Sequence, residues 1–203
     1  MNQQQFRIRE VQPSILYFGT PVVLLSTLNE DETTNLTPMS SAWALGQRIV
    51  LGLGAGGKAL MNLQRWEECV INLPDPSLWQ HVERLAPLTG CDPVPVAKQG
   101  QYKHEKDKFS AAGLSPLPSM TVKPQRIAEC PLQIEARVLH IQMASEDASF
   151  AIIETGALKV HAYEPIVLGD RHIDPSAWSP LIYNFRHYFG LGGELGKTFR
   201  SET

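Results

Sequence analysis

The stretch Gly52-Leu53-Gly54-Ala55-Gly56-Gly57-Lys58 decides between two fold classes. It follows an apolar segment, 48–54, that we expect to be a strand. It precedes a segment, 58–66, in which the spacing of Leu60 and Leu63 predicts a helix. A G-x-G-x-x-G pattern between a strand and a helix is typical of dinucleotide-binding folds, where the helix N-terminus binds a phosphate.

The remainder of the chain favours an antiparallel β protein instead. The helix expected at 58–66 has only about two turns, and no second strand–helix–strand unit follows it. Asp75 does stand 18 residues after Gly57, near the place of the acidic residue in a dinucleotide-binding fold. Even without that fold, the glycines let the backbone approach a phosphate closely, and Lys58 adds positive charge.

Long strands dominate the expected structure. Alternating apolar residues predict two strands, at 132–143 and 150–162, joined by a hairpin at Ser145-Glu146-Asp147-Ala148. Further strands are expected at 15–28, bent at Gly19-Thr20-Pro21, at 37–43 and at 69–73, and a second helix after Asp75-Pro76-Ser77.

Three other segments are irregular. Residues 1–12 are expected to form a mobile or exchanged arm. The proline-containing segment 89–126 predicts a functional loop, because long irregular excursions in a compact domain often carry function. The tail, Ser179 to Phe199, is aromatic and then glycine-rich. We find no repeat and no linker, so residues 1–203 are expected to form one domain.

The composition excludes several classes of protein. Of the 203 residues 43% are hydrophobic and 19% charged, with 15 Gly and 15 Pro, which is unlike a coiled coil, an all-helical array or a disordered chain. A net charge of −3 does not favour a nucleic-acid or anionic-membrane partner. No segment is apolar enough to span a bilayer, and no secretory signal is visible. Three cysteines without a C-x-x-C motif indicate reduced thiols and a cytoplasmic location.

Short polar side chains gather around the turn after the first long strand. Thr27 ends that strand, and Asn35, Thr37, Ser40 and Ser41 follow the turn. Hydroxyl and amide groups in this arrangement are suited to hydrogen-bond a polar ring edge or a phosphate, although ordinary turn chemistry would use the same residue types.

The histidines do not predict a metal site. No H-x-x-x-H or H-x-H pair is present and the cysteines are scattered, so we expect no zinc. A hydrolase triad is equally unsupported, because no G-x-S-x-G motif occurs. In the tail, Tyr183-Asn184-Phe185-Arg186-His187-Tyr188-Phe189 is either a segment that closes the core or an interface, or a lid over a planar ligand.

Six segments carry a resemblance to a known family. They are Thr20-Pro21-Val22-Val23-Leu24-Leu25-Ser26-Thr27, Asn35-x-x-Pro38-x-Ser40-Ser41, Lys58-x-x-x-Asn62-Leu63, Glu68-Cys69-Val70-Ile71-Asn72-Leu73, Asp107-Lys108-Phe109-x-x-Ala112-Gly113-Leu114 and Ile127-x-Glu129-Cys130-Pro131-Leu132-Gln133-Ile134-Glu135. In this order and spacing the chain resembles the flavin reductase-like family of FMN-binding split β-barrels, from Ile15 to about His161 and more weakly in the tail.

The resemblance implies a mainly β split barrel with a few short helices, which forms a homodimer and binds FMN near the subunit interface. Residues implied to contact the flavin ring and ribityl chain are Thr27, Asn35, Thr37, Pro38, Met39, Ser40 and Ser41, with Lys58 and Asn62 near the phosphate. His161 matches a position that nicotinamide approaches, and His187 is a second candidate there. Ala59 departs from the family, in which many members have a phosphate-binding Thr at this position.

The activity implied is an FMN-dependent oxidoreductase that takes hydride from NADH or NADPH, because the flavin accepts the hydride and the protein orients the reactants. The lack of a basic cluster for a 2′-phosphate favours NADH. The electron acceptor would be a small molecule or a monooxygenase partner. The alternatives are an FMN carrier that a partner reduces, without NAD(P)H turnover of its own, and a pyridoxamine-phosphate-oxidase-like oxidase.

Overall fold

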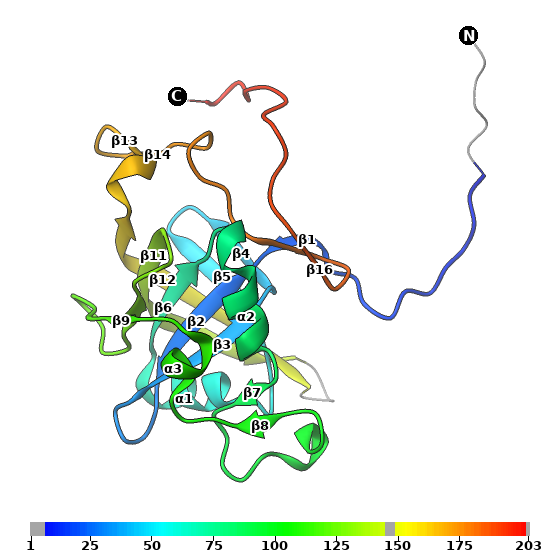
Figure 1. Ribbon diagram of the computed structural model, residues 1–203, viewed down its shortest axis with the longest axis vertical. Coiled ribbons are helices and arrows are strands. Elements are labelled where there is room, and N and C mark those ends of the chain that lie inside the picture. The colour runs from blue at the N-terminus through cyan, green and yellow to red at the C-terminus, as the bar shows by residue number, and fades with distance from the viewer. Residues whose placement is uncertain (1–6, 145–148, 202–203) are drawn as a thin grey trace.

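The computed structural model describes residues 7–144 and 149–201. Its centre is a seven-stranded antiparallel sheet curved into a barrel, as Figure 1 shows. Across the sheet the strands lie in the order β3 (Thr34–Met39), β2 (Val23–Leu28), β6 (Glu68–Leu73), β11 (Leu132–Met143), β12 (Phe150–Ala162), β5 (Arg48–Gly54) and β4 (Ala42–Leu45). Because these pairings are all antiparallel, the chain does not have the parallel sheet of a dinucleotide-binding fold.

Strand β2 is buried on both faces because it separates two hydrophobic clusters. Val23 and Leu25 pack inside the barrel, among apolar residues of β5, β6 and β12. Val22 and Leu24 point the other way, into a cluster outside the barrel that includes residues of α2 (Trp79–Leu85) and α3 (Lys108–Ala112). This position explains why residues 22–25 are all apolar rather than alternating.

Helix α1 (Lys58–Trp66) packs against β2, β3 and β5. It buries Leu60 and Leu63, the two residues whose spacing predicted the helix. It begins after Gly57, which provides no side-chain cap, and ends at Glu67 with a left-handed φ of 54°. The glycine-rich stretch therefore leaves the first turn of the helix open to solvent or a ligand.

The expected elements at 48–54, 58–66, 132–143 and 150–162 are confirmed as β5, α1, β11 and β12. The strand expected at 69–73 is β6, which begins at Glu68. The helix expected after Asp75-Pro76-Ser77 is also confirmed, as a 3-10 helix (Pro76–Leu78) that leads into α2. The Asp75 carboxylate caps its start, because it accepts a hydrogen bond from the backbone N–H of Ser77, 2.8 Å away. The predicted hairpin residues 145–148 lie outside the described residues.

One strand prediction needs correction, and the bend predicted at Gly19-Thr20-Pro21 is confirmed. The single strand expected at 37–43 is wrong, because the chain turns at Ser40-Ser41 from β3, at one edge of the sheet, to β4 at the other; the Ser41 carbonyl accepts a hydrogen bond from Gly52, 2.7 Å away. The segment 15–28 is a bent pair, β1 (Phe18–Pro21) and β2, with a register shift next to Gly19, whose φ is 87°. Only a glycine adopts this backbone conformation without strain.

The irregular segments have little regular structure. Between 88 and 127 the elements are β7 (Leu88–Thr89), β8 (Lys103–His104), α3, β9 (Pro116–Leu117), β10 (Arg126–Ile127) and a 3-10 helix (Val96–Lys98). After the barrel come a 3-10 helix (Glu164–Ile166), β13 (Val167–Leu168), β14 (His172–Ile173), β15 (Ile182–Asn184) and β16 (His187–Phe189). Strands β15 and β16 join β1 in a small separate sheet.

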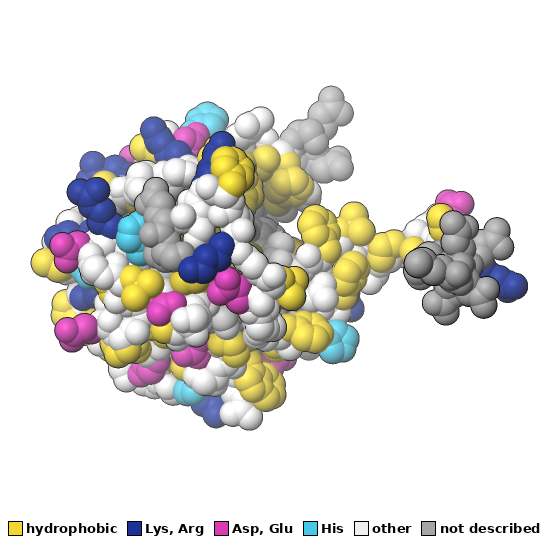
Figure 2. Space-filling view, turned by 90° about the horizontal axis from the view of Figure 1, so that it is seen from above, with side chains coloured by type: hydrophobic (Ala, Val, Ile, Leu, Met, Phe, Trp, Pro, Cys, Tyr) yellow, Lys and Arg dark blue, Asp and Glu magenta, His cyan; other side chains and the backbone are white. Residues whose placement is uncertain are grey.

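The N-terminal segment from residue 7 onward projects from the body, as the blue trace in Figure 1 shows, and it leads into the projection at the right of Figure 2. Of the arm expected at 1–12, residues 7–12 have no regular structure and are exposed, while 1–6 lie outside the described residues. Across the described chain, no helix is long and apolar enough to cross a membrane.

Candidate functional site

A cavity of about 500 Å³ lies where the end of β3, the end of β5 and the N-terminus of α1 meet. Residues of β3 and the loop to β4 line one wall, and Gly52 and Gly54 of β5 continue it. The segment 86–108 and three tyrosines line the remainder. The cavity therefore joins parts of the chain that are far apart in the sequence, including the segment 89–126 in which a functional loop was predicted.

Six of the predicted binding residues line this cavity together. They are Thr37, Pro38, Met39, Ser40, Ser41 and Lys58. The first five are brought there by the turn at Ser40-Ser41, which ends β3, and Lys58 is brought there by the start of α1. This arrangement gives the cavity hydroxyl groups on one wall and a cation at one end.

The other three predicted binding residues, Thr27, Asn35 and Asn62, do not line the cavity but support its wall. The Nδ2 of Asn62 donates to Thr27 Oγ1 at 3.1 Å and to Asn29 Oδ1 at 3.0 Å, which ties α1 to β2. The Nδ2 of Asn35 donates to Thr27 Oγ1 at 3.4 Å and to the lining residue Thr37 at 3.1 Å. These buried polar groups satisfy one another, as groups removed from water must.

One atom of this supporting cluster has no hydrogen-bond partner in the described structure, the Oδ1 of Asn35. It is buried next to Gly90, and a Cβ at Gly90 would lie only 2.4 Å from it. Gly90, which lines the cavity, thus lies next to an acceptor that lacks a donor, while Thr37 is bonded to the other end of the same amide, its Nδ2. Leaving such an acceptor unpaired costs about 1–3 kcal/mol.

The N-terminus of α1 gives one end of the cavity its anion-binding character. Gly57, Lys58, Ala59 and Leu60 all line the cavity, and the helix has neither a side-chain cap nor an acidic residue in its first turn. The first backbone N–H groups of a helix have no partner within the helix, and its dipole favours negative charge there. Ala59 adds no hydroxyl group, so the groups here that could bind an anion are backbone N–H groups and lysines.

Two more lysines, which sequence reasoning did not select, line the cavity with Lys58. The Nζ of Lys98 donates to the Gly56 carbonyl at 3.3 Å, and the Nζ of Lys108 donates to the Leu36 carbonyl at 2.8 Å. Lys108 is 3% exposed, and burial, aided by the neighbouring Lys98, lowers its pKa to about 8. The three lysines therefore bring ammonium groups to this part of the cavity, and that of Lys58 is paired with Glu30, 2.6 Å away.

Another part of the cavity lining is aromatic. Tyr17, Tyr183 and Tyr188 line it, with ring centroids 5.5 Å apart for Tyr17 and Tyr183 and 5.7 Å apart for Tyr183 and Tyr188. The hydroxyl of Tyr188 donates to Glu83 at 2.9 Å, and burial together with this carboxylate raises the pKa of Tyr188. The tail segment therefore closes the core, as the first interpretation of its sequence predicts, and it also presents two aromatic rings to the cavity. Its role as a lid over a planar ligand stays a prediction.

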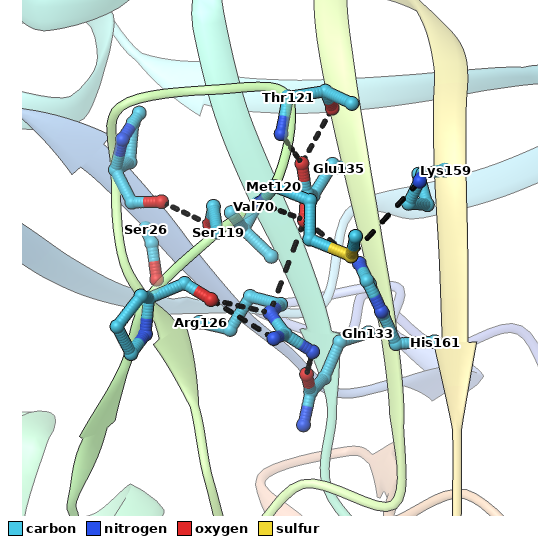
Figure 3. Close-up of polar contacts among 12 residues, drawn as sticks. Ser26, Val70, Ser119, Met120, Thr121, Arg126, Gln133, Glu135, Lys159 and His161 are labelled. Atoms are coloured by element: carbon cyan, nitrogen blue, oxygen red, sulfur yellow. Dashed lines mark hydrogen bonds and ion pairs between the residues drawn. The ribbon is translucent and has the colours of Figure 1, made fainter.

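The two histidines predicted near the nicotinamide lie away from the cavity lining. His187 is exposed on β16, and its Nδ1 lies 3.0 Å from the Phe185 carbonyl, so this nitrogen donates. His161 lies on β12, where its Nε2 is 2.7 Å from the buried carboxylate of Glu135, as Figure 3 shows. Neither imidazole reaches the cavity within this chain.

Glu135 is the centre of a separate polar cluster. Its carboxylate accepts hydrogen bonds from the backbone N–H groups of Met120, 2.8 Å away, and Thr121, 2.6 Å away, and from the Thr121 hydroxyl (Figure 3). Burial by itself would raise the pKa of Glu135, but these bonds and His161 outweigh it and lower the pKa to about 2. The cluster holds the loop before β10 against β11.

Metal and thiol chemistry have no visible basis in the described residues. No three His, Cys, Asp or Glu side chains gather there in a way that could hold a metal ion. Cys69, Cys91 and Cys130 are free and buried. Burial raises the pKa of Cys69 to about 12 and also raises that of Cys130, which keeps both thiols protonated.

Comparison with known proteins identifies a matching family and a close relative in sequence. Residues 15–192 match the family model described as "Flavin reductase like domain". A curated protein from Bacillus subtilis (strain 168), "Uncharacterized protein YdfE", is 59% identical over 202 residues, 99% of this chain and 98% of its own.

Two solved structures show the fold. Flavoredoxin of Desulfovibrio vulgaris (Miyazaki F) matches with a TM-score of 0.78 and 19% identity, over 98% of this chain and 100% of that one. Nitrilotriacetate monooxygenase component B from Bacillus cereus matches with a TM-score of 0.72 and 17% identity, over 91% of this chain and 89% of that one.

Proposed function

The chain belongs to the flavin reductase-like family, and from this premise we propose that it binds FMN in the described cavity and transfers electrons from NADH or NADPH to an acceptor. The observation that carries the proposal is the division of the cavity between a cationic helix N-terminus at one end and a wall of hydroxyl groups and tyrosines elsewhere. A flavin mononucleotide has the matching division, with a phosphate at one end and a planar ring at the other.

The residues present fit this cofactor. The N–H groups of the first turn of α1 and the ammonium group of Lys58 would hold the phosphate. The wall formed by Thr37, Ser40 and Ser41 offers hydrogen-bonding groups to the ribityl chain and to the ring edge. The unpaired Oδ1 of Asn35 behind this wall would gain a donor if a ligand or water ordered there.

When bound, FMN supplies the hydride acceptor, so the protein needs no nucleophile or metal of its own. The tyrosines of the tail would exclude water from the ring and position it by packing. Ser41 is already oriented, because its hydroxyl lies 2.9 Å from that of Tyr17. His161 and His187 remain candidates for the nicotinamide side only if a second subunit brings one of them to the cavity.

A second copy of the chain would complete the site. The outer surface of β4, β5 and β12 carries apolar side chains, which we call the sheet face: the exposed Trp43, Phe150 and Ile152 and the half-buried Val50. Ile152 and Phe150 lie directly opposite the cavity residues Gly52 and Gly54. Paired residues on adjacent strands point to the same side of a sheet, so this surface adjoins the cavity. We propose a homodimer that buries it.

The acceptor is a small molecule or a partner oxygenase. The structural similarity to a protein named nitrilotriacetate monooxygenase component B supports the second possibility for this chain. A carrier flavoprotein is the alternative, because flavoredoxin has the same fold. An oxidase acting on pyridoxamine phosphate is a third candidate, which product analysis with that amine excludes or establishes.

The test is a two-step titration of the purified protein. FMN is added first, and its fluorescence is followed to saturation. NADH or NADPH is then added without oxygen, and the absorbance of the flavin at about 450 nm is followed by stopped flow. Saturable binding and rapid bleaching support the oxidoreductase, binding without bleaching supports the carrier, and the absence of saturable binding rejects both.

A further inference from the structure

Two hydroxyl groups from distant parts of the chain meet at the wall of the cavity. The hydroxyl of Tyr17 lies 2.9 Å from that of Ser41, and both residues line the cavity. The Ser41 carbonyl accepts a hydrogen bond from the N–H of Gly52, 2.7 Å away. The Tyr17 carbonyl accepts one from the N–H of Phe185, 2.8 Å away. The hydroxyl pair therefore joins the turn between β3 and β4 to the segment that Tyr17 shares with the β15–β16 hairpin.

The surroundings of the pair hold both side chains in place. A Cβ at Gly52 would lie 3.0 Å from the Cβ of Ser41, so a side chain there would push the turn away from β5. The ring of Tyr17 meets that of Tyr183 edge-on, with the centroids 5.5 Å apart and the planes at 75°. Edge-to-face packing of this kind is favourable for aromatic rings, and it keeps the phenol group beside Ser41.

The two hydroxyl groups share one hydrogen atom and leave the other available. Among the described residues neither hydroxyl has a second hydrogen-bond partner. A phenolic O–H is a stronger donor than an alcohol O–H, and an alcohol oxygen is the stronger acceptor, so Tyr17 donates to Ser41. The hydrogen atom of Ser41 then remains for an acceptor inside the cavity. Because the Ser41 oxygen already accepts a hydrogen bond, its own O–H is polarised and donates more strongly.

We infer that Tyr17 is a positioning residue, which fixes the Ser41 hydroxyl as a donor to the flavin ring and thereby raises the reduction potential of the bound flavin. The inference rests on the proposed function and extends it to a residue that precedes the six segments resembling the family. Reduction adds negative charge to the ring oxygens, so a donor held against one of them stabilises the reduced form more than the oxidised form. Without Tyr17 the Ser41 hydroxyl is free to rotate and is no longer preorganised as that donor.

The experiment measures the reduction potential of FMN bound to the protein, by titration against a redox dye without oxygen, together with the Kd for oxidised FMN. Tyr17→Phe removes the hydroxyl and keeps the ring that packs on Tyr183. We expect it to leave the Kd for oxidised FMN within about twofold and to weaken the binding of reduced FMN about fivefold relative to that of oxidised FMN. For a two-electron couple this fivefold change lowers the potential by about 20 mV.

A double-mutant cycle shows whether Tyr17 acts through Ser41. Ser41→Ala should lower the potential at least as much as Tyr17→Phe, and adding Tyr17→Phe to Ser41→Ala should change it no further. Tyr163→Phe is the matched control. The hydroxyl of Tyr163 donates to the Ala128 carbonyl, and Tyr163 does not line the cavity, so its loss should leave the potential unchanged.

An equal potential in Tyr17→Phe and the wild type would overturn the inference. A further fall when Tyr17→Phe is added to Ser41→Ala would also overturn it, because Tyr17 would then act by another route. If Tyr17→Phe does not fold, Ser41→Ala decides: a fall of the expected size supports the inference, and an unchanged potential contradicts it. If the wild-type protein binds no FMN, the proposed function itself fails. If it binds FMN and all variants share one potential, only this inference fails.

Discussion

The Nζ of Lys58 lies 2.6 Å from the Oε2 of Glu30, while the other oxygen of the same carboxylate lies 3.0 Å from Arg65. The lysine at the start of α1 is thus held by a carboxylate of the turn between β2 and β3, at the end of the cavity where we place the phosphate. Under the proposed function, a phosphate bound there would share Lys58 with Glu30, so we expect this ion pair to limit the affinity for FMN.

Replacing Glu30 with Gln should strengthen FMN binding by up to about fivefold at low ionic strength, because a partly exposed ion pair contributes up to about 1 kcal/mol. The measurement is the Kd from fluorescence titration. Glu32→Gln is the matched control, since Glu32 lies in the same turn but pairs with Lys123 instead. Weaker FMN binding in Glu30→Gln would mean that Glu30 orients Lys58 rather than competing for it.

Lys58→Ala should weaken FMN binding, and more so at low salt than at high salt. Salt already screens the attraction between an ammonium group and a phosphate, so the difference from the wild type shrinks as ionic strength rises. The check is a series of titrations between about 0.01 and 1 M salt, where the screening length falls from about 30 to 3 Å. An affinity equal to that of the wild type at low salt removes Lys58 from the site.

Gly90→Ala should destabilise the protein by about 1–3 kcal/mol, the usual cost of adding a methyl group to a filled space. The new Cβ would lie 2.4 Å from the Oδ1 of Asn35 and 3.0 Å from the Cγ of Lys58. Urea unfolding measures the change. Gly56→Ala is the control, because a Cβ there meets nothing within 4 Å. Equal stability of the two variants would show that Asn35 and Lys58 can move to make room for a methyl group at Gly90.

Acid should destabilise the protein through Glu135. Its pKa is lowered from 4.5 to about 2 in the folded state, so its stabilising contribution is complete above the higher value and is lost as the pH falls through the lower one. That contribution is roughly 3 kcal/mol at neutral pH. The free energy of unfolding, measured by urea between pH 7 and pH 2, should fall steeply below pH 5.

Glu135→Gln should be less stable than the wild type at pH 7 and less sensitive to acid, because an amide cannot accept all the N–H groups that the carboxylate accepts. Glu129→Gln serves as its control, since Glu129 accepts one exposed hydrogen bond, from Ser115. Parallel pH profiles for Glu135→Gln and the wild type would contradict the assignment.

Ile152→Asp should break the proposed homodimer. Ile152 is 41% exposed on the sheet face, next to the cavity residue Gly52, and a buried charge there would be unpaired. Light scattering coupled to gel filtration gives the mass, and we expect the wild-type protein at twice the chain mass and the variant as a monomer with weakened FMN binding. Leu168→Asp, at an exposed apolar residue of β13, is the control. A monomeric wild type would refute the dimer.

The sequence predicted the elements that short, local residue patterns determine. Alternation over twelve or thirteen residues identified β11 and β12, and the glycines before Lys58 identified the start of α1. Helix α3 was missed, because its five residues are too few to show a helical period, although the Asp107 cap and Gly113 at its end are recognisable signals.

The candidate site was predicted where it is continuous in sequence and missed where it depends on distant contacts. Thr37 to Ser41 line the cavity as one segment. In contrast, Lys108 meets Leu36 across 72 residues, and the motif Asp107-Lys108-Phe109 in which it stands does not by itself place it at the cavity. Asn62 likewise appeared suited to a ligand, but α1 places its amide against Thr27, 35 residues earlier.

The central claim is that this cavity binds FMN through its phosphate, and one titration tests it most directly. Purified protein is added to FMN at low ionic strength, and the change in flavin fluorescence is compared between the wild type and Lys58→Ala. We predict a saturable change for the wild type and a weaker affinity for the variant, with the difference reduced at high salt. A fluorescence that does not change with added wild-type protein would contradict the account.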